Sequence, residues 1–330
     1  MPQPTYDAAF LRTVSPALTQ IAVAWQQAQD RFAASAIFPQ VDVGVQAGSY
    51  ITYRKGDWFR TDAAVRAPGT ETAGSGWNEA FDTYFAKPYG VHKDIDGFTR
   101  QNAQAVGRQP DRDAARFVAN QLLLRREADF VAKFFTTGVW TGALTGQSGA
   151  PTWPQFYQFN DYTNSDPLAT VARAKLEMEQ LTGLSPNVLV CGPQVRLQIA
   201  NHPKVINRIQ YTQRAILTDE LLAALFEVDK FLVPKAIANT ANEGAAADSF
   251  SFTWGKSMLL AYATDAPSTE EPTAGATFTW SGYLGVGATG TRVRRYRIEE
   301  KDVDRVEAEM AYDMKIVAAD CGSFFATAVA

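Results

Sequence analysis

The sequence predicts an α+β protein in which one long helix is followed by a middle third of alternating helices and strands and by a β-rich final third. Apolar residues recur at three- and four-residue spacings over 111–137, which predicts the long helix. Helical and strand patterns alternate over about 166–265, as in an α/β layer. Apolar and charged residues alternate over 304–317, which predicts a strand about twice the usual length.

The long helix has recognisable ends. Asp111 follows Pro110 and is expected to be the N-cap, and Asp113 lies in the first turn, where the helix dipole favours an acid. Gly138 is expected to end the helix. At 1.5 Å per residue the helix is about 38 Å long, which is long for a globular protein and indicates a structural spine.

Residues 1–40 are predicted to form an N-terminal arm that contains a moderately amphipathic helix. In the next segment, two β-rich runs at 50–53 and 81–85 flank a polar stretch over about 60–76 that has no usable periodicity. This pattern is typical of a β-hairpin with a long tip. Because a tip of that length is unusual inside a compact domain, we expect it to protrude and to rest on a partner.

Two helices of the middle third have clear boundaries in the sequence. Asp166 and Pro167 are expected to start the first of them, as N-cap and first helical residue, and Gly183 is expected to end it. Thr218, followed by two acids, is expected to start the second.

Composition and charge exclude several classes of protein. The 330 residues carry a formal net charge of −4, which gives no indication of a dedicated nucleic-acid binder or a polybasic membrane anchor. No apolar stretch reaches the roughly 18 to 20 residues that span a bilayer, and the N-terminus lacks a secretory signal pattern. The only cysteines, Cys191 and Cys321, form no disulfide framework, so we expect a protein of a reducing cytoplasm, with no membrane partner.

Two glycine-containing segments match nucleotide-binding motifs in letters but not in context. Gly285, Gly287 and Gly290 have dinucleotide-fingerprint spacing, but the following RVRRYRIEE predicts a strand where the motif requires a helix. Gly255-Lys256-Ser257 resembles the end of a phosphate-binding loop, but Phe250 stands where its first glycine belongs. A hairpin turn is the favoured interpretation of 285–290, and a nucleotide-dependent enzyme is kept as an alternative.

The sequence contains no convergent set of catalytic residues. Cys191 and His202 could in principle form a nucleophilic pair, but Cys191 ends an apolar strand and His202 precedes a proline at a helix start. Zinc-type spacing of cysteine and histidine is also missing. We therefore predict no catalytic residue, no metal site and no cofactor, and expect the protein not to be an enzyme.

A basic cluster and an acidic run lie next to each other near the C-terminus. Alternation on a strand favours a solvated face for the second half of the acidic run. The arginines are the one place that suits phosphate contact, and pairing with the nearby acids across strands or subunits is an equally good interpretation. The basic residues are Arg292, Arg294, Arg295 and Arg297, and the acids are Glu299, Glu300, Asp302, Asp304, Glu307 and Glu309.

The order of these segments resembles the major capsid proteins of tailed bacteriophages, which have the Hong Kong 97-like fold. The resemblance covers nearly the whole chain, and its specificity comes from the joint occurrence of its segments. They are GDWFR (56–60), RAPGTE (66–71), DTYF (82–85), FVANQLLLRREADFVAKFFTTGVW (117–140), DYTNSDP (161–167), NHPKVINRIQYTQRAILTDELLAALF (201–226), NTANEG (239–244) and AEMAYDMKIVAADCG (308–322).

The resemblance implies an α+β capsid fold with an N-terminal arm, an extended β-hairpin loop, a spine helix, a peripheral domain and an axial α/β domain. The implied ranges are 1–40 for the arm, 41–95 for the extended loop and the entry to the peripheral domain, 96–165 for the peripheral domain with its spine helix over 111–137, 166–265 for the axial domain, and 266–330 for the return to the peripheral domain with the strand over 304–317.

The resemblance also implies a function and partners. Subunits would assemble as hexamers and pentamers into an icosahedral shell around double-stranded DNA, which they would contact non-specifically. The extended loop would reach over a neighbouring copy, and its expected contact residues are Trp58, Arg60, Asp62, Arg66, Glu71 and Trp77. Further expected partners are a portal and, in some shells, a decoration protein. The expected location is the virion, after assembly in the host cytoplasm.

Some members of this family carry a long N-terminal scaffolding region. About 40 residues precede the first predicted strand here, so we expect a separate scaffolding protein instead. An encapsulin-type nanocompartment shell, which has the same fold and encloses cargo enzymes, is the main alternative to a viral capsid.

Overall fold

A computed structural model describes residue 27 and residues 31–105, 109–209, 217–266, 271–284 and 291–330. Most of the predicted N-terminal arm, residues 1–26 and 28–30, and the glycine motif at 285–290 lie outside the described residues. None of the described helices is both long enough and apolar enough to cross a membrane.

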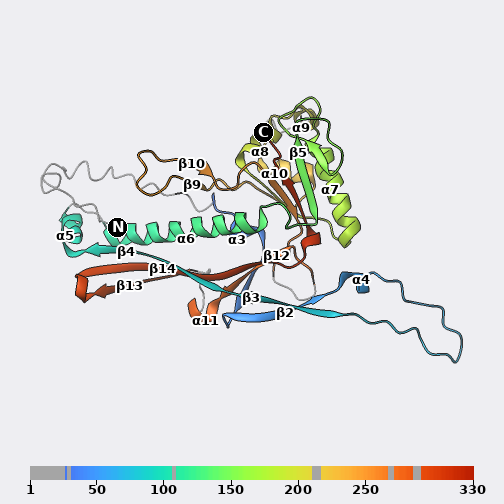
Figure 1. Cartoon of the computed structure of the whole chain (residues 1–330), viewed down its shortest axis with the longest axis horizontal. Coiled ribbons are helices and arrows are strands. Elements are labelled where there is room, and N and C mark those ends of the chain that lie inside the picture. Colours follow the sequence, from blue (N-terminus) through green and yellow to red (C-terminus); the bar gives the residue numbers. More distant parts are fainter. Residues whose placement is uncertain (1–26, 28–30, 106–108, 210–216, 267–270, 285–290) are drawn as a thin grey trace.

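One half of the molecule is a five-stranded sheet with a long helix along one face (Figure 1). The central strand is β14 (Val303–Ile316), which pairs antiparallel with β12 and β13 on one side and with β4 on the other. The remaining strand, β1, pairs parallel with β12. Their bounds are β1 Gln40–Val43, β4 Lys87–Asp96, β12 Gly275–Trp280 and β13 Arg292–Ile298, and the helix is α6, Pro110–Phe134.

The other half is a six-stranded sheet covered by four helices. In order across the sheet, the strands are β6 (Gln155–Tyr157), β5 (Gly142–Gln147), β15 (Gly322–Ala326), β11 (Met258–Ala261), β7 (Val188–Cys191) and β8 (Lys230–Leu232). The helices are α7 (Pro167–Thr182), α8 (Pro193–Ala200), α9 (Pro203–Ile209) and α10 (Asp219–Phe226).

The remaining elements are short or project from the two halves. They are α3 (Ala34–Ile37), α4 (Lys55–Trp58), α5 (Gly97–Ala105), α11 (Ser281–Leu284), the 3-10 helices η2 (Glu299–Lys301) and η3 (Ala319–Cys321), and two ribbons, β2 (Ala47–Tyr53) with β3 (Glu79–Phe85) and β9 (Ile237–Asn239) with β10 (Phe250–Phe252).

Alternate residues of the six-stranded sheet face two different cores. In β7, Val188 and Val190 belong to the core that includes α6, whereas Leu189 and Cys191 belong to the core under α7 to α10. A strand buried on both faces is a continuous apolar run, which is how this segment appears in the sequence. The six-stranded sheet therefore joins the two halves of the molecule.

The predicted domain boundaries do not coincide with the division between the two sheets. β5 and β6 come from the predicted range 96–165, and β15 comes from 266–330. All three nevertheless lie in one sheet with strands of the range 166–265, because β15 pairs with β11 on one side and with β5 on the other. Such non-local strand pairing leaves no local pattern in a sequence, so ranges along the chain do not indicate which sheet each strand joins.

The long helix lies where it was predicted, but its ends differ. It spans Pro110–Phe134 and not 111–137, and its N-cap is Gln109. The prediction of Asp111 as N-cap was wrong, because its carboxylate pairs with Arg100 and Arg295 at 2.7 and 3.3 Å. The helix stops before Gly138 because Phe135 turns into the core, where its ring meets Trp254 and Phe324 at centroid distances of 5.1 and 5.2 Å.

The predicted boundaries of the middle helices are confirmed. Asp166 Oδ1 accepts a hydrogen bond of 3.1 Å from the Ala169 N–H, with Pro167 as the first helical residue of α7. Gly183 ends α7 with φ +71°, in the left-handed region that favours glycine. Thr218 Oγ1 accepts from the Leu221 N–H at 3.3 Å at the start of α10.

The predicted long strand is β14, one residue nearer the N-terminus than 304–317. Its even-numbered residues, such as Val306 and Met310, pack into the core shared with α6. Its odd-numbered residues, such as Glu307 and Glu309, alternate toward the opposite side of the sheet. Asp313 is also odd-numbered, and its carboxylate still reaches Lys133 in the last turn of α6 at 3.0 Å. The face away from α6 is therefore available for other contacts.

The β2–β3 hairpin rests its stem on this second face and then leaves the body of the molecule (Figure 1). Phe278 of β12 lies opposite Asp313 of β14, and the rings of Tyr50 and Tyr84 stack on it at centroid distances of 5.3 and 4.7 Å. Gly48 permits this packing, because a Cβ there would lie 2.6 Å from the Tyr84 hydroxyl oxygen.

Candidate functional site

The hairpin contacts the body of its own chain as far as residue 59. Lys55 pairs with Asp320 of η3, whose other carboxylate oxygen accepts from the Thr141 hydroxyl at 2.6 Å. Hydrogen bonds from Lys55 and Thr141 hold the pKa of Asp320 below its ordinary value. The Phe59 ring lies next to Gly183, since a Cβ on that glycine would be 3.6 Å from it.

Beyond this attachment the tip stands free of the rest of the described chain. Residues 60–76 are all exposed, and in Figure 1 they form the projection at the lower right. The tip begins and ends at one buried carboxylate, because Asp57 accepts from the Asn78 backbone and side-chain amides at 3.0 and 2.9 Å. These hydrogen bonds lower the pKa of Asp57. The negatively charged Asp57 carboxylate therefore holds the two ends of the tip together.

The structure brings together two of the six predicted contact residues, Trp58 and Trp77. Their ring centroids are 5.8 Å apart, and the Trp58 ring also contacts Tyr53 at 5.9 Å. Both indoles stay exposed, at 62% and 59%. Tryptophan is enriched among the residues that carry most of the binding energy of protein interfaces.

The other four predicted contact residues do not join this cluster. Arg60 lies 3.7 Å from Asp57, and Asp62 accepts from the Ser75 hydroxyl at 2.6 Å. Arg66 donates to the Thr70 carbonyl at 2.5 Å, and Glu71 is exposed. Three of the four therefore order the tip itself.

Sequence reasoning missed part of the exposed apolar surface. On the ribbon face turned away from Phe278, Ile51 lies opposite Phe81, and Phe85 follows on the same face. Phe81 is 68% exposed. The alternation of Phe81 and Phe85 is visible in the sequence, but it indicates a half-buried strand and cannot show that the apolar side is left uncovered. We call this set, Ile51, Tyr53, Trp58, Trp77, Phe81 and Phe85, the aromatic stripe.

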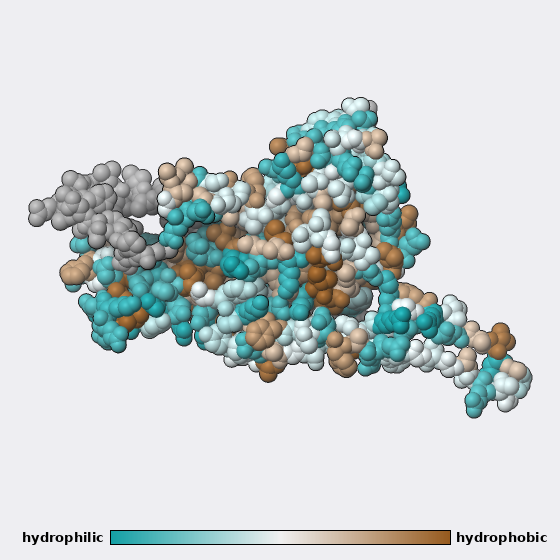
Figure 2. Space-filling view, viewed as in Figure 1, coloured by the Kyte–Doolittle hydropathy of each residue, from teal (hydrophilic) through white to brown (hydrophobic). Residues whose placement is uncertain are grey.

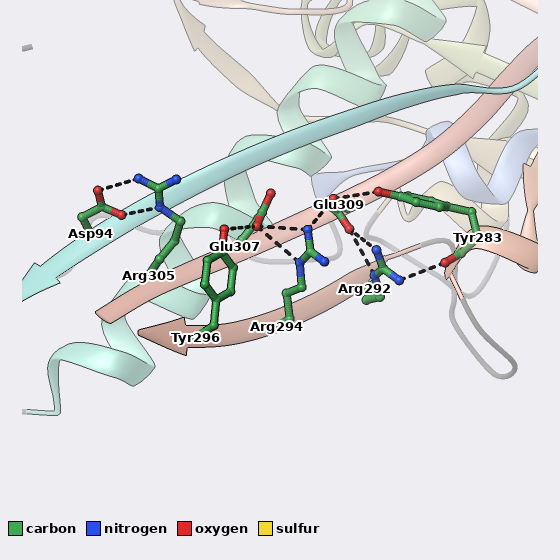
Figure 3. Close-up of polar contacts among 8 residues, drawn as sticks. All are labelled: Asp94, Tyr283, Arg292, Arg294, Tyr296, Arg305, Glu307 and Glu309. Carbon is green, nitrogen blue, oxygen red and sulfur yellow. Dashed lines mark hydrogen bonds and ion pairs between the residues drawn. The ribbon is translucent and has the colours of Figure 1, made fainter. Parts of the chain in front are cut away.

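A polar cluster lies on the face of the five-stranded sheet that is turned away from α6, and Figure 3 shows it. Arg292 donates to Glu309 at 3.1 Å and to the Tyr283 carbonyl at 2.9 Å. Arg294 reaches Glu307 and Glu309 at 3.3 and 3.2 Å. We call this set, Tyr283, Arg292, Arg294, Tyr296, Glu307 and Glu309, the arginine lattice.

Two further contacts complete the surface in Figure 3. Arg305 donates two hydrogen bonds to Asp94, of 2.7 and 2.8 Å, and the Tyr296 hydroxyl donates to Glu307 at 2.9 Å. The bond to Asp94 raises the pKa of Arg305. Burial raises the pKa of Glu309, but hydrogen bonds from Arg292 and Tyr283 outweigh it and hold that pKa below its ordinary value.

The arginines are therefore paired with acids across strands, which was one of the two interpretations left open by the sequence. The prediction of a simply solvated acidic face was wrong for Asp304 and Glu309, which are only 6% and 8% exposed. Asp304 pairs with Arg100 and also with Arg295 at 3.3 Å. The arginines of the neighbouring strand and helix cover these carboxylates, which alternation along one strand cannot indicate.

Cys191 and His202 have structural environments. The His202 Nδ1 accepts from the Lys204 N–H at 3.2 Å, so its Nε2 carries the proton and donates to the Ser165 hydroxyl at 2.9 Å. Burial lowers the pKa of His202 and raises that of the Cys191 thiol. With both ring nitrogens in use, this histidine is not placed to act as a base. The described residues also contain no group of three metal-ligating side chains.

Comparison with known proteins identifies one similar sequence and several similar structures. No protein-family model matches the chain. The major capsid protein of Burkholderia phage BcepMu is 25% identical over 258 residues, which cover 76% of this chain and 77% of that protein. A phage-related protein of Bordetella bronchiseptica has a TM-score of 0.67 at 21% identity, over 92% of this chain and 94% of that one.

Two phage shells have the same fold. The mature capsid of bacteriophage PhiM1 matches with a TM-score of 0.59 at 11% identity, over 93% of this chain and 89% of that chain. The capsid of phage XM1 matches with a TM-score of 0.56 at 11% identity, over 97% and 98%. The predicted α+β fold of the Hong Kong 97-like type, with its extended hairpin and spine helix, is confirmed, and so is the resemblance to phage major capsid proteins.

Proposed function

We propose that this chain, which has the fold of tailed-phage capsid proteins, is the major capsid subunit of a phage and has a structural, non-enzymatic role. In this proposal, copies assemble as hexamers and pentamers into an icosahedral shell that encloses double-stranded DNA. The similarity to the major capsid protein of phage BcepMu supports the role. The shell capsids of PhiM1 and XM1 support the assembly, since they have the same fold.

The observation that carries the proposal is the hairpin. Its tip is exposed over its whole length, and the aromatic side chains at its root and along its stem, such as Trp58, Trp77 and Phe81, are 59–68% exposed. Exposed apolar surface of this kind is a liability in a monomer and an advantage in an assembly. A projection that binds another part of an identical subunit makes a head-to-tail contact, and such contacts generate rings and closed shells when their rotation closes.

Each part of the subunit has a proposed place in the shell. The loop over 41–95 reaches over a neighbour, and the helix α6 with the five-stranded sheet forms the peripheral part. Residues 166–265, together with β5, β6 and β15 that complete their sheet, form the axial part around the symmetry axes. The N-terminal arm over 1–40 joins subunits as well. These assignments rest on the resemblance and on the strand pairing described above.

The partners follow from this role. The subunit binds copies of itself, a separate scaffolding protein during assembly in the host cytoplasm, a portal at one vertex and the packaged DNA. A decoration protein would bind the outside of the finished virion. Of the predicted contact residues, Trp58 and Trp77 are proposed as the main contacts, because they form the exposed cluster described above.

Expression of the chain with and without a scaffolding partner, followed by electron microscopy, tests the proposal. We expect closed particles. A chain that stays monomeric under both conditions and binds a nucleotide tightly, with binding lost on Gly287→Val, would be an enzyme and not a shell. Particles purified from the native host that hold a cargo protein and no nuclease-protected DNA would identify a nanocompartment instead.

A second experiment tests the role of the tip. Replacement of residues 60–76 by a short Gly-Ser linker should leave a folded and soluble subunit, because these residues are exposed. That subunit should form few particles. Assembly at the level of the parent chain would contradict the assignment of the hairpin as the part that joins subunits.

A further inference from the structure

We propose that the aromatic stripe of one subunit packs against the arginine lattice of a second copy. This inference rests on the proposed shell function and deepens it, because it names the surface that receives the hairpin. Neither surface is covered by the described part of its own chain. Trp58 and Phe81 are largely exposed, and on the lattice the Arg294 side chain and Tyr296 are exposed to 46% and 40%.

The two surfaces lie on the same side of the molecule. The hairpin stem packs on Phe278, which lies opposite Asp313 of β14, and the lattice acids Glu307 and Glu309 are also odd-numbered residues of β14. Residues an even number apart on a strand share a face, so the hairpin and the lattice share the face away from α6. Along the strand they are about 20 Å apart, at about 3.3 Å for each of six residues.

The two surfaces also lie toward opposite ends of the molecule. In Figure 1 the hairpin projects at the lower right, whereas β13 ends at the lower left. Figure 2 shows hydrophilic and hydrophobic residues mixed on the projection and mainly hydrophilic residues around the lower left end. A second copy placed beside the first in the same orientation would bring its lattice toward the first copy's hairpin, which carries the stripe along its stem and at the root of its tip. This is a head-to-tail arrangement, in which one chain supplies both halves of the contact.

The chemistry of the two surfaces is complementary. Hydrogen bonds to Glu307 and Glu309 use the edges of the Arg292 and Arg294 guanidinium groups and hold them in place. Arg292 lies 4.6 Å from the centre of the Tyr283 ring and Arg294 lies 5.7 Å from that of Tyr296, so each guanidinium has one flat face over a ring of its own chain and the other face left for a second ring. Aromatic rings stack on such faces, both by cation–π attraction and by planar packing. A guanidinium that is already ion-paired and ordered loses little freedom when a ring covers it.

The chain already contains contacts of this kind. The Arg292 guanidinium lies 4.6 Å from the centre of the Tyr283 ring, and Arg173 lies 4.0 Å from that of Trp153. In the first case the arginine is ion-paired to Glu309 at the same time. A ring from a neighbouring hairpin would extend this arrangement across the subunit boundary.

Engineered cysteines test the contact directly. Both native cysteines are buried, so they contribute little background. Trp77→Cys or Phe81→Cys is combined with Tyr296→Cys in one chain, and assembled particles are treated with a short bismaleimide. We expect a ladder of covalent oligomers from at least one of the two pairs. Each single variant, and Trp77→Cys combined with Tyr162→Cys in the other half of the subunit, should give no ladder.

Absence of a ladder from both pairs in well-formed particles would overturn the inference while leaving the shell function intact. If the parent chain forms no particles under any condition, the shell function itself has failed. Loss of assembly in stripe variants without any ladder would mean that a different protein covers the stripe, which also overturns the inference.

A conservative substitution gives an independent test. Arg294→Lys keeps the positive charge but removes the flat guanidinium face, so the subunit concentration required for assembly should rise about tenfold. Arg173→Lys makes the same change at an arginine outside the lattice and should leave that concentration unchanged. Circular dichroism and thermal unfolding of the unassembled subunits check that both variants fold. Equal assembly of the Arg294→Lys variant and the parent would count against stacking.

Discussion

The region around α6 and the β2–β3 hairpin are both rich in aromatic side chains. These side chains are buried around α6 but exposed in the hairpin. Beside α6, Phe130 meets Phe134 and Trp254 at centroid distances of 4.8 and 5.3 Å, and all three are buried. In the hairpin, Trp58 and Trp77 meet at 5.8 Å and both remain exposed. Similar ring contacts therefore accompany very different degrees of burial.

A single subunit therefore buries the aromatic side chains around α6 by itself, but it leaves those of the hairpin for a partner to bury. A buried aromatic side chain gives its hydrophobic stabilisation to the folded monomer. An exposed aromatic side chain still has most of its apolar surface in water, and burial of that surface can stabilise a later association. The comparison therefore predicts that the two regions respond differently to the same kind of substitution, in the unassembled subunit and in the shell.

Removal of one ring from each region should have the largest effect. Phe130→Ala leaves a cavity in a fully buried site and should lower the free energy of unfolding by about 3–5 kcal/mol. Phe81→Ala should change it by less than about 0.5 kcal/mol, because that ring is exposed, but should reduce particle yield. Urea unfolding of the unassembled subunits and particle counts measure the two effects. Equal losses of stability would remove the distinction between the regions.

A buried carboxylate in the α6 region provides the next test. Glu127 accepts hydrogen bonds from the Ala34 N–H at 2.7 Å and from the Trp254 indole N–H at 2.6 Å. An amide cannot accept both bonds through its two terminal atoms, so Glu127→Gln should lower the free energy of unfolding by about 2–3 kcal/mol. A loss below about 0.5 kcal/mol, on the same urea assay, would show that these bonds do not hold the three segments together.

The pH dependence of this site has a definite sign. Burial raises the pKa of Glu127 above its ordinary value, although the hydrogen bonds that it accepts act in the opposite direction. The folded state then binds the proton more tightly than the unfolded state. The stability contributed by Glu127 is therefore greatest below the ordinary glutamate pKa and falls as pH rises through the raised one. The difference in unfolding free energy between the parent and Glu127→Gln, measured across this range, should shrink with rising pH.

Local patterns were sufficient to predict most of the elements. The spacing of apolar residues predicted α6, alternation predicted β14, and cap residues such as Asp166 and Thr218 predicted helix starts. The N-cap of α6 was mispredicted, because the carboxylate of Asp111 has a stronger alternative in the Arg100 and Arg295 guanidinium groups. Tertiary ion pairs of this kind are not visible in the local sequence.

Pairing and exposure could not be predicted. Nothing in the sequence indicates that β15 joins β11 and β5, because these strands are far apart in the chain. Sequence reasoning also predicted contact residues in the tip but not that Ile51 and Phe81 stay uncovered, since apolar alternation normally indicates a buried face. The candidate site was therefore located approximately, and its composition came from the structure.

The junction between the two regions depends on the packing around Gly48. A Cβ at Gly48 would lie 2.6 Å from the Tyr84 hydroxyl and would displace the ring stacked on Phe278, so Gly48→Ala should cost about 1 kcal/mol of stability. It should also lower particle yield, because the hairpin would leave the body at a different angle. Gly56→Ala, with open space around its Cβ, is the matched control in the same hairpin. Equal yields from the two variants would show that the stem tolerates the shift.

The attachment of the hairpin to η3 should have the smallest effect on stability. Lys55 and Asp320 are both substantially exposed, so Lys55→Ala should lower the free energy of unfolding by at most about 0.5 kcal/mol. Because the pKa of Asp320 is lowered, the contribution of the pair is present above the ordinary aspartate pKa and is lost as pH falls through the lowered one. Carboxyl NMR titration of the parent and Lys55→Ala should show the Asp320 pKa moving up toward its ordinary value while staying below it, since the Thr141 hydrogen bond remains. An unchanged titration would mean that Lys55 leaves Asp320 in solution and that the hairpin is held to its own chain by its stem alone.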